Sequence, residues 1–133
     1  MKIMVYNKKT PGDKLAMELA VSHAKAFEGT IDLVSVITEQ SGAPQEVVEE
    51  ESQKLKKTAA ETADAHNVTC KSQMVLTALP IGEALVQYAE KNKIDEIIMP
   101  LRRRSKLGKL FFGSDSQYII LEAPCRVITI KDS

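Results

Sequence analysis

Apolar and polar positions change periodicity repeatedly along this chain. Short runs rich in apolar and β-branched residues, typical of buried strands, are separated by longer stretches whose apolar residues recur every three or four positions, typical of helices. The predicted strands cover residues 3–6, 31–37, 68–76, 94–99 and 126–130. The predicted helices lie between them: one from an N-cap at Thr10 to Gly29, one from Pro44 to about His66, one opening at Pro80, and one from Gly113 to Glu122.

The strict alternation of these elements predicts how they assemble. Five strands separated by four helices imply βαβ units, which need right-handed crossovers and a mainly parallel sheet covered on both faces. We therefore predict an α/β fold, a doubly wound parallel sheet formed by a single domain over residues 1–133. In such sheets, ligands bind beyond the carboxyl ends of the strands, where the direction of winding reverses.

Composition narrows the function classes. The 18 basic and 18 acidic side chains cancel, which argues against a protein built mainly to coat nucleic acid or an anionic membrane. No apolar run approaches the ~20 residues of a membrane span, and the first residues become polar too soon for a signal peptide. The two cysteines, Cys70 and Cys125, have no CxxC spacing. These features predict a cytoplasmic protein with reduced thiols and with neither nucleic acid nor membrane as a partner.

The segment from Met99 to Ser114 carries the most candidate chemistry. It leaves a predicted strand, contains five basic residues, and enters a helix at Gly113-Ser114. A helix N-terminus offers unpaired amides and a partial positive charge, which suit a phosphate group. The plainer interpretation is a solvated basic loop before an ordinary capped helix. Asp115 in the first helical turn favours that interpretation, because its charge competes with an incoming anion.

Signals of enzymatic chemistry are weak elsewhere. We find no paired catalytic carboxylates, no Ser-His-Asp order and no nucleophile elbow. His23 and His66 have no cysteine or aspartate at metal-ligand spacing. The sequence therefore predicts no catalytic residues, no metal site and no enzyme, with hydrolysis of a nucleotide as the least favoured activity.

Three segments near the end of the chain resemble the universal stress protein family. They are residues 94–99 (IDEIIM), 113–118 (GSDSQY) and 123–127 (APCRV). The family pattern runs D-L-I-V-M-G-x-x-G-x9-G-S and later A-P-C-P-V, and the order of elements agrees over the whole chain. The resemblance implies the strand order 3-2-1-4-5 and a homodimer paired through the last strand. That strand, with Val127, Ile128, Thr129 and Ile130, would otherwise be an exposed apolar edge that invites pairing.

The chain departs from the pattern that the resemblance associates with ATP binding, G-x2-G-x9-G-[ST]. Pro100 and Arg103 replace the two leading glycines, and Lys8 stands where the family has an acidic residue after the first strand. Proline fixes φ and removes an amide donor, whereas glycine lets the backbone approach a phosphate. We therefore predict a homodimeric regulatory or interaction protein of the stress response, which requires no cofactor and has lost the family's usual ATP binding.

An alternative keeps a ligand at the same edge of the sheet. Lys8, Arg102 and Arg103 could replace the backbone cradle with a side-chain anion site, because guanidinium groups pair with phosphate in a bidentate manner. The module would then bind ATP, AMP or another phosphate-bearing anion. The residues expected to contact it are Lys8, Val36, Met99, Arg102, Arg103, Gly113 and Ser114.

Overall fold

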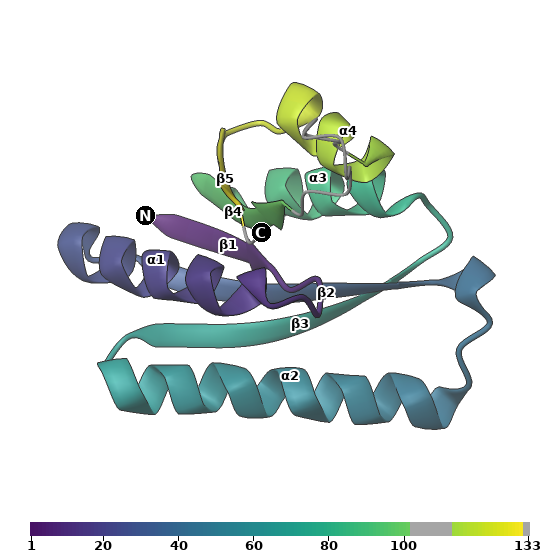
Figure 1. Ribbon diagram of the computed structural model, residues 1–133, viewed down its shortest axis with the longest axis horizontal. Helices are drawn as coiled ribbons and strands as arrows, with labels where there is room; N and C mark the ends of the chain where they lie inside the picture. Colours follow the sequence, from purple (N-terminus) through teal and green to yellow (C-terminus); the bar gives the residue numbers. More distant parts are fainter. Residues whose placement is uncertain (102–112, 132–133) are drawn as a thin grey trace.

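The computed structural model describes residues 1–101 and 113–131, which form a parallel sheet covered by helices (Figure 1). The strands are β1 (Lys2–Tyr6), β2 (Thr30–Thr38), β3 (Thr69–Thr77), β4 (Glu96–Leu101) and β5 (Arg126–Lys131). The helices are α1 (Gly12–Phe27), α2 (Gln45–His66), α3 (Ile81–Lys91) and α4 (Ser114–Glu122), with a short 3-10 helix η1 (Glu39–Ser41) after β2. All pairings are parallel, in the order β3-β2-β1-β4-β5. The predicted fold class and strand order are confirmed.

Two apolar cores lie on opposite faces of the sheet. Helices α1 and α2 cover one face, and α3 and α4 cover the other (Figure 1). Along β1, Ile3 and Val5 pack toward α1 and α2, while Met4 and Tyr6 pack toward α3 and α4. These four side chains are buried, as expected for a central strand of a parallel sheet that is covered on both sides.

The longest helix, α2, lies on the sheet along a narrow apolar stripe. Its buried residues are Leu55 and Ala59, and most of its other positions are polar. Glu50 and Lys54 form an exposed pair one turn apart. Within the described ranges, no helix combines the length and the apolarity that crossing a bilayer would require, α2 included.

The start of β4 lies two residues later than the sequence pattern predicted. The amide of Ile94 still donates to the carbonyl of Ala89, 3.0 Å away, and so belongs to the turn that ends α3. Lys93, just before it, has a positive φ of 52°. Ile94 is therefore a buried residue of the turn that follows α3, and it does not belong to β4.

The end of β4 also differs from the prediction, because the strand continues through Pro100. Pro100 pairs with Ile130 of β5, whereas the pairing of β4 with β1 ends at Ile98. A missing N–H at Pro100 therefore breaks no bond to β1, and a proline is tolerated where a ladder has already ended.

Two buried carboxylates have partners far away in the sequence. Glu96 of β4 is 1% exposed, and its carboxylate lies 2.9 Å from Nδ1 of His23 on α1 and 3.8 Å from Nε of Arg126 on β5. Asp32 of β2 is equally buried and accepts a hydrogen bond of 2.8 Å from the Tyr88 hydroxyl. A buried charge needs such partners, so these contacts fix α1 and α3 onto the sheet.

The His23–Glu96 contact gives a stability prediction. We expect His23→Ala to lower the free energy of unfolding by about 2 kcal/mol, because the buried carboxylate loses its nearest partner. The measurement is urea denaturation followed by circular dichroism. Lys57→Ala, which removes one member of an exposed pair with Glu61, should change stability by less than ~0.5 kcal/mol. If His23→Ala costs the same in a Glu96→Gln background, the pairing contributes nothing.

Candidate functional site

A pocket of about 220 Å³ lies at the carboxyl ends of β1 and β2, at the edge of the sheet where doubly wound folds bind ligands. It brings together two of the predicted site residues, Lys8 and Val36. Its lining consists of Tyr6, Asn7, Lys8, Lys9, Ser35, Val36, Ile37, Met74 and Ile81. Asn7 donates from Nδ2 to the hydroxyl of the buried Ser35, 3.2 Å away, which joins the ends of the two strands.

The carboxylate of Asp13 organises the loop that follows β1. It accepts the amide of Lys8 at 3.0 Å and the amide of Thr10 at 3.2 Å. Lys9, between them, adopts a left-handed conformation with φ of 61°. Burial raises the pKa of Asp13, and the amide hydrogen bonds and the nearby Lys8 oppose that rise.

The start of α1 differs from the predicted cap. Pro11, and not Thr10, occupies the N-cap position, and no side chain caps the helix there. The Thr10 hydroxyl is buried without a hydrogen-bond partner among the described residues. Asp13 nevertheless reaches back to the amide of Thr10, as the acidic residue of a capping box does.

The charges lining the pocket are cationic. Nζ of Lys9 lies 2.6 Å from Oε2 of Glu51, a pairing that lowers the pKa of Glu51 and ties the loop to α2. Nζ of Lys8 lies 5.9 Å from the centroid of the Tyr6 ring. Burial raises the pKa of Tyr6 to about 12, so its hydroxyl remains protonated at neutral pH. The described lining thus presents two ammonium groups and no carboxylate.

The remaining predicted site residues are placed differently. Met99 is fully buried in the core beneath α3 and α4, so its side chain does not join the pocket lining described above. Gly113 is the N-cap of α4 and Ser114 is its first residue, exposed to solvent. Arg102 and Arg103 lie outside the described residues. The structure thus brings Lys8 and Val36 together and leaves the basic segment untested.

Asp115 was expected to compete with an anion at the start of α4, but its carboxylate is turned to α3. Oδ1 of Asp115 accepts the amide of Gly82 at 2.9 Å. A Cβ at Gly82 would lie 3.0 Å from the Asp115 carbonyl oxygen and 3.1 Å from Cβ of Tyr118. The first turns of α3 and α4 are therefore in close contact, beside Ile81 of the pocket. Gly82, in the first turn of α3, is the residue in the sequence that could have indicated this contact.

The two thiols are poor nucleophiles. Cys70 and Cys125 are unpaired with each other and only partly accessible. Burial, with Asp32 nearby, raises the pKa of Cys70 to about 11, and burial likewise raises the pKa of Cys125. In residues 1–101 and 113–131, no three His, Cys, Asp or Glu side chains gather where they could hold a metal ion.

Comparison with known proteins places this geometry in a family. The model of the universal stress protein family matches residues 1–131. The chain belongs to that family. A universal stress protein of Thermus aquaticus is 29% identical over 123 residues, covering 89% of each chain. A solved universal stress protein of Archaeoglobus fulgidus superposes with a TM-score of 0.85 at 23% identity, covering 98% of each chain. Another from that organism, in complex with dAMP, gives a TM-score of 0.79 at 18% identity, again over 98% of each chain.

For this universal stress protein, the match confirms the resemblance seen in the last third of the sequence. The similarity to the solved structures confirms the fold, including the parallel order 3-2-1-4-5. Within that scaffold, the chain has Pro100 inside β4, two lysines lining the pocket, and an aspartate bound to the loop amides.

Proposed function

We propose that this universal stress protein is a cytoplasmic regulatory or interaction protein that does not bind ATP through the family's glycine pattern and does not catalyse a reaction. Pro100 carries the proposal. It is buried within β4 and paired with Ile130, at the position of the first glycine of the pattern. A proline in a strand supplies no amide to a phosphate and cannot adopt the positive φ that a glycine turn allows.

The loop after β1 supports the same conclusion. Lys8 replaces a carboxylate that would accept hydrogen bonds from a sugar. The amides of Lys8 and Thr10, in the loop before α1, already donate to Asp13. A nucleotide arriving in the family's manner would meet a cation in place of an acceptor and amides that are already bonded.

The carboxylates near this edge are poorly arranged for catalysis. Asp13 accepts two loop amides, and Asp115 accepts the amide of Gly82. Each carboxylate keeps further lone pairs, but the chain's own amides set its orientation. Both carboxylates thus hold backbone segments in place, and this structural role supports a non-enzymatic function.

The nucleotide proposal predicts a gain of binding when the pattern is restored. Titration calorimetry of the natural protein with ATP and magnesium at physiological salt should show no binding at concentrations up to about 1 mM. The triple variant Lys8→Asp, Pro100→Gly, Arg103→Gly should bind ATP at least about tenfold more tightly, because an acceptor and a flexible backbone return together. Tight ATP binding by the natural protein would overturn the proposal.

A second candidate function is binding of a small phosphate ligand such as AMP. The pocket favours it, because Lys8 and Lys9 line a concave space at the carboxyl edge of the sheet. The relative from Archaeoglobus fulgidus solved in complex with dAMP supports a ligand of this chemistry. In this arrangement, side-chain cations would replace the glycine backbone as phosphate partners.

Arg103→Ala tests the second candidate. If AMP binds through the basic segment, calorimetry should show that this substitution abolishes binding, because a bidentate partner of the phosphate is lost. Lys91→Ala, at the end of α3, is the matched control and should leave AMP affinity within about twofold. An unchanged affinity in Arg103→Ala would count against the site.

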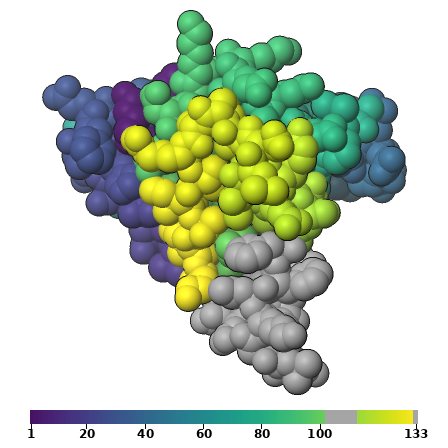
Figure 2. All heavy atoms as spheres, turned by 90° about the horizontal axis from the view of Figure 1, so that it is seen from above, coloured from purple at the N-terminus to yellow at the C-terminus, as the bar shows by residue number. Residues whose placement is uncertain are grey.

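We further propose that the protein is a homodimer paired through β5. This strand is one edge of the sheet, and its residues Val127 to Ile130 are apolar or β-branched. On the neighbouring α4, Ile120 and Leu121 are exposed. Figure 2 shows the atoms of α4 and β5 together on one face. An open apolar edge invites a second strand, and a second copy supplies one by symmetry.

Proline at position 128 tests the dimer. Ile128→Pro should convert dimers to monomers in analytical ultracentrifugation, because the ring removes a backbone donor and blocks close strand pairing. Thr69→Pro, at the start of the opposite edge strand β3, should leave the association state unchanged. Circular dichroism establishes that both variants fold. Dimers that persist in folded Ile128→Pro would locate the interface elsewhere.

A further inference from the structure

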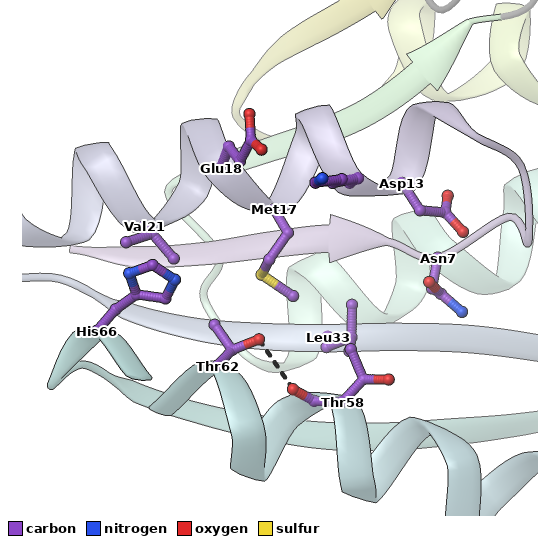
Figure 3. Close-up of a pocket in the computed structure, with 10 residues that line it drawn as sticks. Asn7, Asp13, Met17, Glu18, Val21, Leu33, Thr58, Thr62 and His66 are labelled. Carbon is purple, nitrogen blue, oxygen red and sulfur yellow. Dashed lines mark hydrogen bonds between the residues drawn. The ribbon is translucent and has the colours of Figure 1, made fainter. Parts of the chain in front are cut away.

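A groove of about 500 Å³ lies between α1 and α2 (Figure 3). It shares a single lining residue, Asn7, with the pocket at the strand ends. The groove follows α2 from Thr58 to His66, a distance of about 12 Å along the helix axis. It is therefore a second concave surface, long enough for a small organic molecule.

The floor of the groove is apolar. Leu33 of β2 and Val21 of α1 are buried beneath it, and the Met17 side chain extends from α1 into the space (Figure 3). A ligand lying here would remove apolar surface from water on both sides of the contact. The unbranched thioether of Met17 also adapts readily to the shape of an occupant.

The hydroxyl groups on the α2 side present only lone pairs to the groove. The hydroxyl of Thr62 donates to the carbonyl of Thr58 at 2.8 Å, and that of Thr58 donates to the carbonyl of Lys54 at 3.1 Å (Figure 3 shows the first). A hydroxyl has one proton, so each remains available as an acceptor. Asn7 also directs its amide nitrogen to Ser35, which leaves its side-chain oxygen as an acceptor.

The charges on the α1 side favour a cation. Asp13 and Glu18 line the groove with two carboxylates, against one ammonium group from the exposed Lys14. Asp13 lies at the same end as Asn7 and Thr58, as Figure 3 shows. Burial raises the pKa of Asp13, so a cation beside it would stabilise its ionised form. His66 lies at the opposite end, beside Val21.

We propose that the α1–α2 groove binds a small organic amine, with its ammonium group at the Asp13 end and its apolar body on Met17, Val21 and Leu33. The ammonium group would donate to Asp13 and to the acceptors of Asn7 and Thr58. An anion would meet the carboxylate of Asp13, and a neutral hydrocarbon would cover the acceptors of Asn7 and Thr58 without supplying a donor. This site does not depend on the proposed loss of ATP binding.

The test uses three six-carbon probes that differ in charge: hexylamine, hexan-1-ol and hexanoate. Binding is followed at pH 7.5 by methyl NMR of Met17 and Leu33. Hexylamine should bind at least about tenfold more tightly than hexan-1-ol, and hexanoate should bind least, because a charge-assisted hydrogen bond adds to the same apolar contact. Equal affinities for hexylamine and hexan-1-ol would overturn the proposal.

Substitutions in and near the groove test where hexylamine binds. Asp13→Asn should weaken hexylamine binding about tenfold and leave hexan-1-ol unchanged, whereas Glu61→Gln, an equal loss of charge on exposed α2, should change neither. Thr62→Phe should fill the groove and abolish binding of both probes. Should Asp13→Asn fail to fold, the exposed Glu18→Gln replaces it, with an expected loss of about threefold. Full hexylamine binding by folded Thr62→Phe would place the amine outside the groove.

Discussion

The carboxylate of Asp13 fixes the loop between β1 and α1, and both candidate sites are built around that loop. By accepting the amides of Lys8 and Thr10, it holds Lys9 in a left-handed conformation. On one side of the loop, the lysines line the pocket at the strand ends; on the other, Asp13 itself lines the α1–α2 groove. Asp13 thus supports the loop whose lysines line the pocket and supplies a carboxylate to the α1–α2 groove.

At the carboxyl edge of the sheet in this universal stress protein, several backbone amides are hydrogen-bonded to the chain's own side chains. Amides in the loop before α1 and at the start of α3 are bound by the chain's own aspartates, and β4 contains a proline. Backbone donors that are already paired contribute little to a ligand, because a new bond must replace an existing one. The scaffold of the family is thus retained, and the described lining of the pocket at the strand ends carries the side-chain cations Lys8 and Lys9.

The partners of the two buried carboxylates, Glu96 and Asp32, were not identified from the sequence. From the sequence, His23 was considered only as a metal ligand, and Glu96 only as part of the motif of residues 94–99. In the structure they meet across 73 positions of sequence. Tyr88 and Asp32 meet across 56. Helical or strand periodicity describes the face on which a residue lies, but it carries no information about which polar residue lies opposite on another element.

The sequence by itself determined the alternation of elements, the two-sided burial of the central strands and, through its motifs, the family and strand order. The alternation and the burial follow from local periodicity, whereas the strand order was implied by the resemblance of the motifs to the family. Only the tertiary structure decided that Pro100 lies inside β4, that Asp115 binds Gly82, and that a groove opens between α1 and α2. Each of these depends on the distance between elements, which is set by the packing of side chains from separate parts of the chain.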